Sequence, residues 1–180
     1  MSMWCHTGSR WFGVLFSCGL TACTLSVSPL DTLTQAPPDS TRARAMRRLN
    51  LASAYYEQNQ NEVARQEVRA ALQIDPQFAQ AYSLLGLIHQ RAQAPALAQQ
   101  SFEQALLLAA EPLGVPSELA AIQHNYGWFL CEQKRFAEAQ TQFDRALSQP
   151  LYAEASKTSQ AVEFCQARAA AMLSMRERNN

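Results

Sequence analysis

Small and bulky apolar residues recur along this chain at a nearly constant interval. The step from Ala64 to Ala98 is 34 residues, and the pair Leu51 and Ala52 falls on Leu85 and Gly86 at the same shift. Within each interval the apolar positions follow a helical period twice, first over one segment and then over the next. In the first segments, the recurring positions are Leu51, Ala52 and Tyr55, then Leu85, Gly86 and His89, then Tyr126, Gly127 and Leu130. In the second segments, they are Ala64, Val68 and Ala71, then Ala98, Phe102 and Ala105, then Ala139, Phe143 and Ala146. The pattern predicts two amphipathic helices per interval.

A period of about 34 residues with small residues where two helices touch is typical of the tetratricopeptide repeat. The sequence therefore predicts an all-α fold, a right-handed α-solenoid of about three and a half helix-turn-helix repeats. We expect full repeats near 45–78, 79–112 and 120–153, and a partial repeat at 154–180. The step from Ala98 to Ala139 is 41 residues, so the loop before the third repeat is longer than the others.

The fourth repeat is predicted to be incomplete. Residues 151–154 open another first helix, which we expect to run through Met172, but no matching second helix follows. Its glycine position is taken by Ala161 or Glu163, depending on the register. This segment is either a polar cap or the start of an array cut short, because terminal repeats differ where their outer face meets water.

The N-terminus has the features of a secretory signal. Arg10 precedes a short apolar run, residues 11–20, which small residues follow. That run is about half of the roughly 20 residues that a membrane-spanning helix needs. We expect a signal peptide over 1–22, a flexible tether over 23–41 containing Pro37 and Pro38, and the helical domain over 42–180.

Composition and charge point away from catalysis and nucleic acid. The chain has 15 basic and 15 acidic residues, which leaves no basic footprint for a nucleic-acid partner. His124 and Cys131 share a helix face, but seven residues at 1.5 Å each place them about 10.5 Å apart along the axis. We find no metal-ligand spacing and no phosphate loop. We therefore expect no enzyme activity, cofactor, metal or small-molecule substrate, although a small enzyme using Cys131 is a third hypothesis.

Two of the five cysteines lie in the repeats. Cys131 and Cys165 occupy near-equivalent places in successive first helices, whose axes should be about 8–10 Å apart. Bridged Cα atoms are usually about 5.5–6 Å apart. We therefore predict two unpaired, half-buried thiols, although an oxidising compartment would permit a bond. Likewise, His89 falls on a core position and is predicted to be packed rather than reactive.

The first helices are expected to line a concave groove. Counting repeat positions places an apolar stripe there, formed by Leu49, Tyr56, Leu87 and Trp128 and rimmed by polar groups. Exposed apolar grooves of this kind bind partners, so we predict a site comprising Leu49, Tyr56, Leu87, Arg91, His124 and Trp128. The alternative is that the next helix or the N-terminal tether covers the stripe.

Four arginines gather where the tether meets the first helix. They are Arg42, Arg44, Arg47 and Arg48. Such a cluster could touch anionic lipid head groups or an acidic partner. We favour the simpler interpretation that they form a solvated helix face.

The third repeat carries the most specific resemblance. The segment 125–139, NYGWFLCEQKRFAEA, and the segments 63–67 and 71–76 resemble the type IV pilus biogenesis/stability lipoproteins, the PilW/PilF family. The resemblance covers about residues 42–155. It implies a pilotin on the inner leaflet of the outer membrane, which helps the secretin channel (PilQ) to localise and multimerise. This chain has fewer repeats than members of that family usually carry.

Residues 20–23, Leu-Thr-Ala-Cys, resemble the bacterial lipobox. The resemblance implies cleavage before Cys23, diacylglycerol on its thiol and acylation, for example by palmitate, of its new amino group. Thr24 is not the aspartate linked with inner-membrane retention, so the analogy implies an anchor in outer-membrane lipid. The alternative is an ordinary signal peptide.

Two binding functions remain open at this point. The first is a lipid-anchored scaffold, on the periplasmic face of the outer membrane, that assists assembly of a PilQ-like secretin. The second is a general periplasmic tetratricopeptide adaptor lipoprotein with another envelope protein as its client. Neither involves nucleic acid or a small-molecule substrate.

Overall fold

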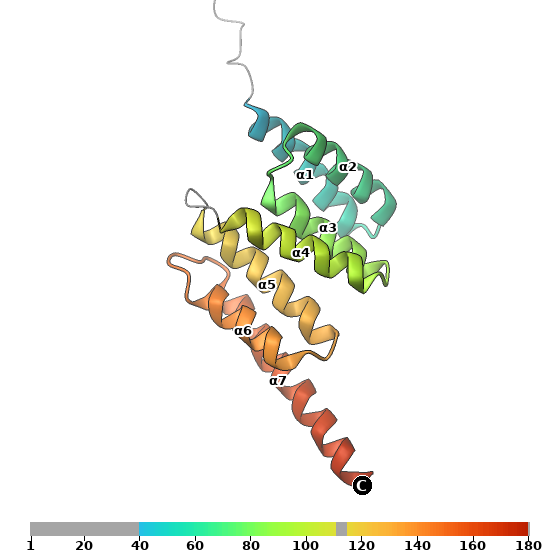
Figure 1. Cartoon of the computed structure of the whole chain (residues 1–180), viewed down its shortest axis with the longest axis vertical. Coiled ribbons are helices and arrows are strands. Elements are labelled where there is room, and N and C mark those ends of the chain that lie inside the picture. The colour runs from blue at the N-terminus through green and yellow to red at the C-terminus, as the bar shows by residue number, and fades with distance from the viewer. Residues whose placement is uncertain (1–39, 111–114, 180) are drawn as a thin grey trace, which may run out of the picture. The chain divides into compact units, whose positions relative to one another are not determined.

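The computed structural model describes residues 40–110 and 115–179, and within these ranges the chain forms seven helices (Figure 1). The signal peptide, Cys23 and almost all of the tether lie outside the described residues. The helices are α1 (Thr41–Glu57), α2 (Asn61–Ile74), α3 (Ala79–Arg91), α4 (Pro95–Ala109), α5 (Pro116–Glu132), α6 (Phe136–Leu147) and α7 (Ala155–Arg178). The first helix thus begins at Thr41, with its N-terminus capped by the Ser40 hydroxyl, which accepts from the Ala43 amide at 3.1 Å.

Small residues let the two helices of each pair approach closely. A Cβ built on Gly86 would lie 2.8 Å from the Phe102 ring, and one on Gly127 would lie 2.7 Å from the Phe143 ring. Both phenylalanines are fully buried. In the first pair, Ala52 and Val68 occupy the corresponding places and are also fully buried. Because Val68 on α2 is smaller than phenylalanine, it leaves room for the methyl group of Ala52 on α1.

Each pair turns at a residue with a left-handed backbone. Asn59, Gln93 and Lys134 have φ of 60°, 58° and 63°, and each follows the first helix of its pair by the same number of steps. This single conformation ends the first helix and reverses the chain into the second. Successive pairs then stack by contact of the second helix of one pair with the first helix of the next, and their first helices also touch.

The helix α7 packs on the third pair, and it is the last helix in the part of the chain that the structure describes. Within the described ranges, α7 contacts α5 and α6 and no other helix (Figure 1). It continues past Ala167, where the turn of a full repeat would fall, and ends at Arg178. We expected this helix to reach about Met172, so it is longer than the sequence pattern suggested.

Hydrogen bonds between first helices fix the register of α7. Asn125 bonds to Ser83, which lies 42 residues before it in the sequence. This separation is one residue longer than the repeat interval of 41 residues between Gly86 and Gly127. Thr158 bonds to His124 in the same way, across 34 residues. If this bond too reaches one residue beyond the repeat interval, the interval is 33 residues and Lys157 is the residue equivalent to His124. The glycine position therefore falls on Gln160, and neither Ala161 nor Glu163 occupies it.

Cys131 and Cys165 are joined by a disulfide, so the prediction of two unpaired thiols was wrong. Their Cα atoms lie 5.8 Å apart, and both side chains are buried rather than half-buried. The prediction compared helix axes, but each Cα lies about 2.3 Å from its axis. Two Cα atoms that face each other are therefore about 4.6 Å closer than the axes, which brings them within bridging distance.

Two of the arginines near the start of α1 pair inside the first repeat. Arg42 lies 2.8 Å from Asp75 and also covers the Phe78 ring, and Arg48 lies 2.9 Å from Glu67. These contacts fit the solvated-face interpretation better than a dedicated lipid or partner site. His89, predicted to be in the core, is only partly buried.

Candidate binding groove

Neighbouring first helices contact each other through a recurring pair of positions. On α1 and α3, the Arg91 guanidinium lies 3.6 Å from the centroid of the Tyr56 ring. On α3 and α5, the Gln90 amide donates to Glu132 at 2.5 Å. On α5 and α7, the corresponding contact is the disulfide between Cys131 and Cys165. One geometric place is thus filled by a cation–π contact, a hydrogen bond and a covalent bond in turn.

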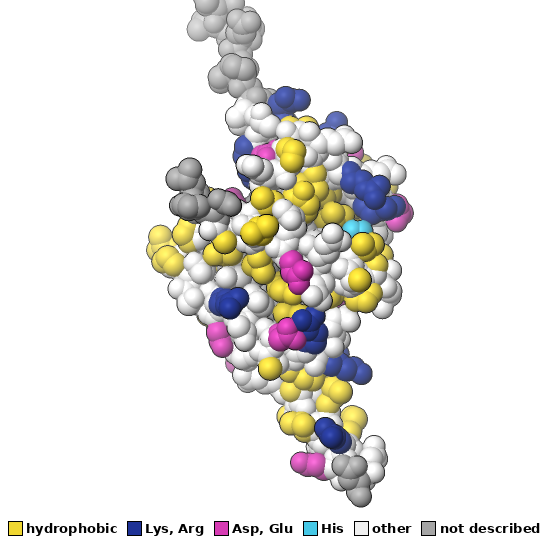
Figure 2. Space-filling model, viewed as in Figure 1, with side chains coloured by type: hydrophobic (Ala, Val, Ile, Leu, Met, Phe, Trp, Pro, Cys, Tyr) yellow, Lys and Arg dark blue, Asp and Glu magenta, His cyan; other side chains and the backbone are white. Residues whose placement is uncertain are grey.

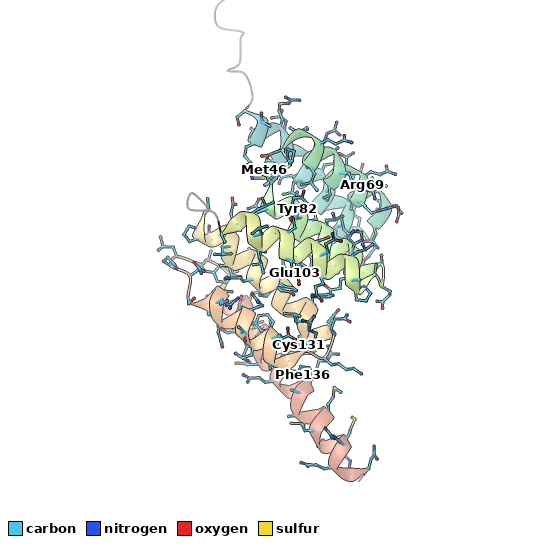
Figure 3. The ribbon with its side chains drawn as sticks, in the orientation of Figure 1. Met46, Arg69, Tyr82, Glu103, Cys131 and Phe136 are labelled. Atoms are coloured by element: carbon cyan, nitrogen blue, oxygen red, sulfur yellow. A yellow bond between two sulfur atoms is a disulfide. The ribbon has the colours of Figure 1, made fainter. Side chains whose placement is uncertain are left out.

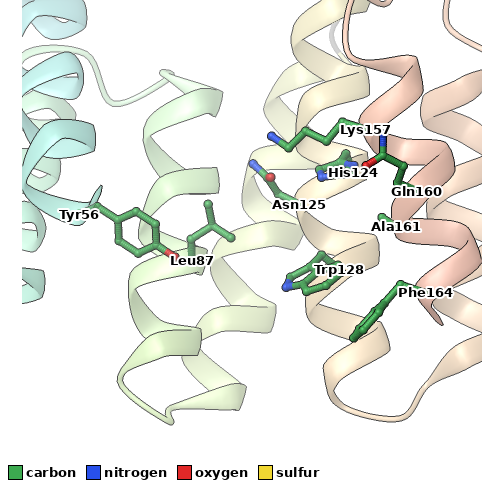
Figure 4. Close-up of a pocket in the computed structure, with 9 residues that line it drawn as sticks. All are labelled: Tyr56, Leu87, His124, Asn125, Trp128, Lys157, Gln160, Ala161 and Phe164. Carbon is green, nitrogen blue, oxygen red and sulfur yellow. The ribbon is translucent and has the colours of Figure 1, made fainter. Parts of the chain in front are cut away.

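A hollow of about 500 Å³ opens beside these contacts, between α3 and the pair α5 and α7 (Figure 4). Its apolar walls are Tyr56, Leu87, Trp128, Ala161 and Phe164, and we call it the aromatic hollow. The Trp128 and Phe164 rings stack with centroids 5.3 Å apart. Its polar lining residues are His124, Asn125, Lys157 and Gln160. An open apolar hollow with a few polar groups is the kind of surface that binds a partner.

A second hollow of about 320 Å³ continues the groove toward α1. Leu87 and Asn125 line both hollows, so the two share a border. The second hollow is more polar, with Asn50, Ser53 and Gln80 among its lining side chains. These amides and hydroxyl could hydrogen-bond a polypeptide backbone that lies along the groove.

Five of the six predicted groove residues lie in these hollows. Tyr56, Leu87, His124 and Trp128 line the aromatic hollow, and Leu49 lines the second one. Arg91 lines neither. Its guanidinium donates to the backbone oxygen of Tyr56 at 2.5 Å and to Asn59, so it ties α3 to the first turn. Arg91 thus has a structural contact outside both hollows, and partner binding by all six residues remains a prediction.

The sequence analysis missed the contribution of α7. Lys157, Gln160, Ala161 and Phe164 all line the aromatic hollow. The signal was present, because a register of 33 residues places Lys157 and Ala161 opposite His124 and Trp128. The sequence analysis instead left two registers open, with Ala161 or Glu163 at the glycine position, and neither is the observed one. The predicted stripe is therefore neither fully open nor covered, since Phe164 of the next helix flanks Trp128 and leaves a hollow.

A buried polar network anchors the start of α7. The Thr158 hydroxyl is fully buried and lies 2.9 Å from His124 Nδ1 and 3.0 Å from the Tyr152 hydroxyl. Burial lowers the pKa of His124, the Lys157 charge lowers it further, and Glu154 opposes them. His124 therefore stays neutral at pH 7 and serves as a hydrogen-bonding group.

The groove carries little net charge. Lys157 lies 3.2 Å from Glu154, and both side chains are more than half exposed. Burial raises the pKa of Tyr56, with Arg91 opposing this shift, so its hydroxyl remains protonated near neutral pH. The hollow is thus suited to binding by shape and apolar contact more than by charge.

The chemistry available in the described residues is limited. The Cys131 sulfur is bonded to Cys165 and buried, so it is not available as a nucleophile in this structure. No group of three or more His, Cys, Asp or Glu in residues 40–110 and 115–179 could hold a metal ion. Over the same ranges, no helix combines the length and apolar character needed to cross a membrane.

Comparison with known families agrees with this architecture. Residues 77–150 match a tetratricopeptide repeat family model, and residues 52–93 match a second model for the same repeat. The chain therefore belongs to the tetratricopeptide repeat proteins, and its fold is the all-α fold that the sequence predicted.

Within that class, the chain is homologous to the type IV pilus biogenesis proteins PilF and PilW, which confirms the family resemblance. It is 32% identical over 143 residues to the type IV pilus assembly protein PilF of Pseudomonas aeruginosa, covering 79% of this chain and 53% of PilF. It is also 30% identical over 121 residues to an uncharacterized protein of Haemophilus influenzae, covering 67% of this chain and 64% of that protein. The chain thus spans about half to two-thirds of the length of these relatives.

Solved structures give the same relationship. A structure of Pseudomonas aeruginosa PilF superposes with a TM-score of 0.62 at 30% identity, covering 72% of this chain and 57% of that one. The structure of PilW, a widely conserved type IV pilus biogenesis factor, gives 0.61 at 30% identity, covering 70% and 55%. The N-terminal domain of STI-1 from C. elegans, at 22% identity, a TM-score of 0.53 and coverage of 69% and 98%, shares the fold alone.

Proposed function

We propose that this chain is a pilotin, a lipid-anchored scaffold that promotes assembly or stability of the secretin in type IV pilus biogenesis. Homology to PilF and PilW is the observation that carries the proposal. The role is binding, with no catalytic step, and its partner is a secretin subunit. The proposed place of action is the periplasmic face of the outer membrane.

The aromatic hollow supports a binding role. Trp128 and Phe164 present a stacked aromatic surface, and Phe164 remains 48% exposed. Buried aromatic side chains dominate the binding energy of protein interfaces, and an exposed pair of rings provides such an anchor. We propose that a segment of the secretin seats an apolar side chain here and continues along the polar hollow toward α1.

The lipid anchor is proposed from the sequence of residues 20–23. Acyl chains on Cys23 would contribute about 0.8 kcal/mol per buried CH₂, and several chains hold a protein stably where one is marginal. Replacement Cys23→Ala should move the protein from the membrane pellet to the soluble fraction after ultracentrifugation. A variant that still sediments with membranes would contradict a lipid anchor at this residue.

A deletion strain tests the secretin role. Loss of the gene should abolish secretin multimers, seen as a high-mass band on immunoblots, together with twitching motility. Expression of the wild-type chain should restore both. Intact multimers and motility in the deletion strain would refute the proposal. Affinity purification from the outer membrane that recovers another complex and no secretin would instead favour the general adaptor role.

A further inference from the structure

Two contacts attach α7 to α5, and they lie two helical turns apart. The first is the hydrogen bond between His124 and Thr158, and the second is the disulfide between Cys131 and Cys165. Seven residues separate the two contacts on each helix, which is about 10.5 Å along the axis. Figure 3 labels Cys131, which lies at the C-terminal end of α5.

The residues of α7 that form the aromatic hollow lie along this same span. Lys157 precedes Thr158 by one residue, and Phe164 precedes Cys165 by one residue. The hydrogen-bonded contact therefore sets the position of Lys157, whereas the disulfide sets that of Phe164. Because Phe164 stacks on Trp128, the aromatic wall depends on the second contact.

The other contacts of α7 are with α6, against which it packs more extensively than against α5, and Gln166 donates to Gln140 of α6 at 3.1 Å. In each full repeat the second helix packs on the first, but the corresponding face of α7 carries Ser156, Ser159, Gln160 and Glu163, all exposed. Beyond the disulfide, Met172, Leu173 and Met175 are exposed as well. Figure 2 shows hydrophobic side chains on the surface at this end of the chain. Near Phe164, Ala161 is buried in the core around α5 and α6, and Val162 is partly buried against that core. Such a helix loosens when its covalent attachment is removed.

We propose that the aromatic hollow is complete only when Cys131 and Cys165 are bonded, so that partner binding requires oxidation of this pair. The binding part of this inference rests on the proposed function of the groove. In the reduced chain, α7 stays attached at Thr158 but releases Phe164 from Trp128. Cys131 and Cys165 are thus positioning residues that act through Phe164.

The oxidation balances with a disulfide-containing oxidant. One cysteine thiolate attacks a sulfur of the oxidant and forms a mixed disulfide, and the second cysteine then displaces the reduced oxidant. The pair loses two electrons and two protons, and the oxidant becomes a dithiol. In a reducing compartment both cysteines would stay as thiols and the aromatic hollow would be incomplete. It would be completed when the chain reaches an oxidising compartment.

The test compares the oxidised full-length chain with the chain reduced by dithiothreitol and with the variant Cys131→Ser/Cys165→Ser. A Trp4→Phe/Trp11→Phe background leaves Trp128 as the sole tryptophan. Fluorescence reports Trp128, nuclear magnetic resonance of the imidazole reports His124, and a purified type IV pilus secretin subunit is the binding probe. Val68→Ala, in the core of the first repeat, is a control for loss of stability at a distance.

We expect reduction and the double serine variant to shift Trp128 emission to longer wavelength while the His124 signals stay in place. Secretin affinity should fall on the order of tenfold, as expected if the wall is formed in about a tenth of the molecules, and reoxidation should restore it. Val68→Ala should leave Trp128 emission unchanged.

Two results would overturn the inference. One is unchanged Trp128 emission and affinity on reduction. The other is joint loss of the Trp128 and His124 signals with the helical circular dichroism, which would make the bond a general stabiliser. If Trp128 shifts but neither form binds the secretin, the hollow depends on the disulfide and the proposed function fails instead.

Discussion

Helices α5 and α7 occupy successive first-helix places in the stack, yet they are held by different means. On α5, Gly127 admits the Phe143 ring of α6, and Lys134 turns the chain so that α6 can pack. On α7, Gln160 stands in the glycine place and the helix runs on. Close packing of a glycine against a buried ring joins α5 to α6, whereas a hydrogen bond and a disulfide join α7 to α5.

The array thus has two parts that are held differently, namely the three full pairs α1 to α6 and the helix α7. The three full pairs bury their small and aromatic residues against each other, so their stability comes from packing. The last helix buries only Thr158, Ala161 and Cys165, and it is joined to α5 by a hydrogen bond and a disulfide. The aromatic hollow lies where the two parts meet, with Trp128 on the packed side and Phe164 on the attached side.

The largest effect is expected from truncating the aromatic ring of the packed part. Phe143→Ala removes a fully buried side chain and should lower the free energy of unfolding by about 3–5 kcal/mol. Phe164→Ala on the attached helix should cost far less, because that ring is 48% exposed. Urea unfolding of both variants gives the comparison. Equal losses would show that α7 is packed as tightly as a full repeat.

Removing the disulfide is expected to have the next largest effect. Constraint of the unfolded chain by a bond that closes 34 residues should contribute about 2–4 kcal/mol. Cys131→Ser/Cys165→Ser should therefore lower the unfolding midpoint in thermal denaturation followed by circular dichroism. Hydrogen exchange should rise over the part of α7 around Cys165 more than in α5. Uniform loss of protection across all helices would contradict a separate attached part.

The close glycine contacts can be tested with the first repeat as a guide. Gly86→Ala should cost about 1–3 kcal/mol, because its new Cβ would meet the Phe102 ring. Gly86→Ala/Phe102→Val recreates the Ala52 and Val68 pair of the first repeat and should relieve the clash. A double-mutant cycle in urea measures this coupling. Additive losses would mean that the clash is absorbed elsewhere.

The smallest effect is expected from pH. Since burial lowers the pKa of His124, the unfolded chain binds a proton more readily than the folded one. The stability contributed by neutral His124 is present above its ordinary pKa of 6.5 and declines as pH falls below that value. The pKa of His89 is lowered too, by burial and by Arg65 and Arg69, and adds in the same direction.

His124→Gln should therefore flatten the fall in unfolding free energy between pH 7.5 and about pH 5, apart from the part due to His89. Comparing His124→Gln with His89→Gln by urea denaturation at several pH values separates the two. Identical pH profiles for wild type and His124→Gln would show that His124 is not held neutral by the fold.

The repeats could be predicted from sequence because their packing depends on residue size at fixed intervals. Gly86 with Phe102 and Gly127 with Phe143 repeat one pairing of a small and a large residue, which is typical of the tetratricopeptide repeat. Contacts between repeats left a weaker signal. In these contacts, a residue bonds to the neighbour of its equivalent in the next repeat, as Ser83 does with Asn125. An alignment that uses the repeat period alone therefore pairs the wrong residues.

The last helix shows the limit of that signal. Because Ser156, Ser159 and Glu163 are polar, this face of the helix carries no apolar period. The apolar pattern therefore could not set the register of the helix. The disulfide was missed for a related reason, because the estimate used helix axes rather than facing Cα atoms. Both errors affected the same wall of the binding groove, and with it Phe164 and Lys157.

We propose that the chain binds its partner through the aromatic hollow, and the variant Trp128→Ala removes an aromatic ring from the wall of that hollow. Leu107→Ala, at an exposed site on α4, is the matched control. Trp128→Ala should weaken binding of the purified secretin subunit by roughly thirtyfold or more, as truncation of an aromatic anchor does, while the chain stays folded at the assay temperature. Unchanged affinity, or a loss explained by unfolding of the variant, would contradict the account.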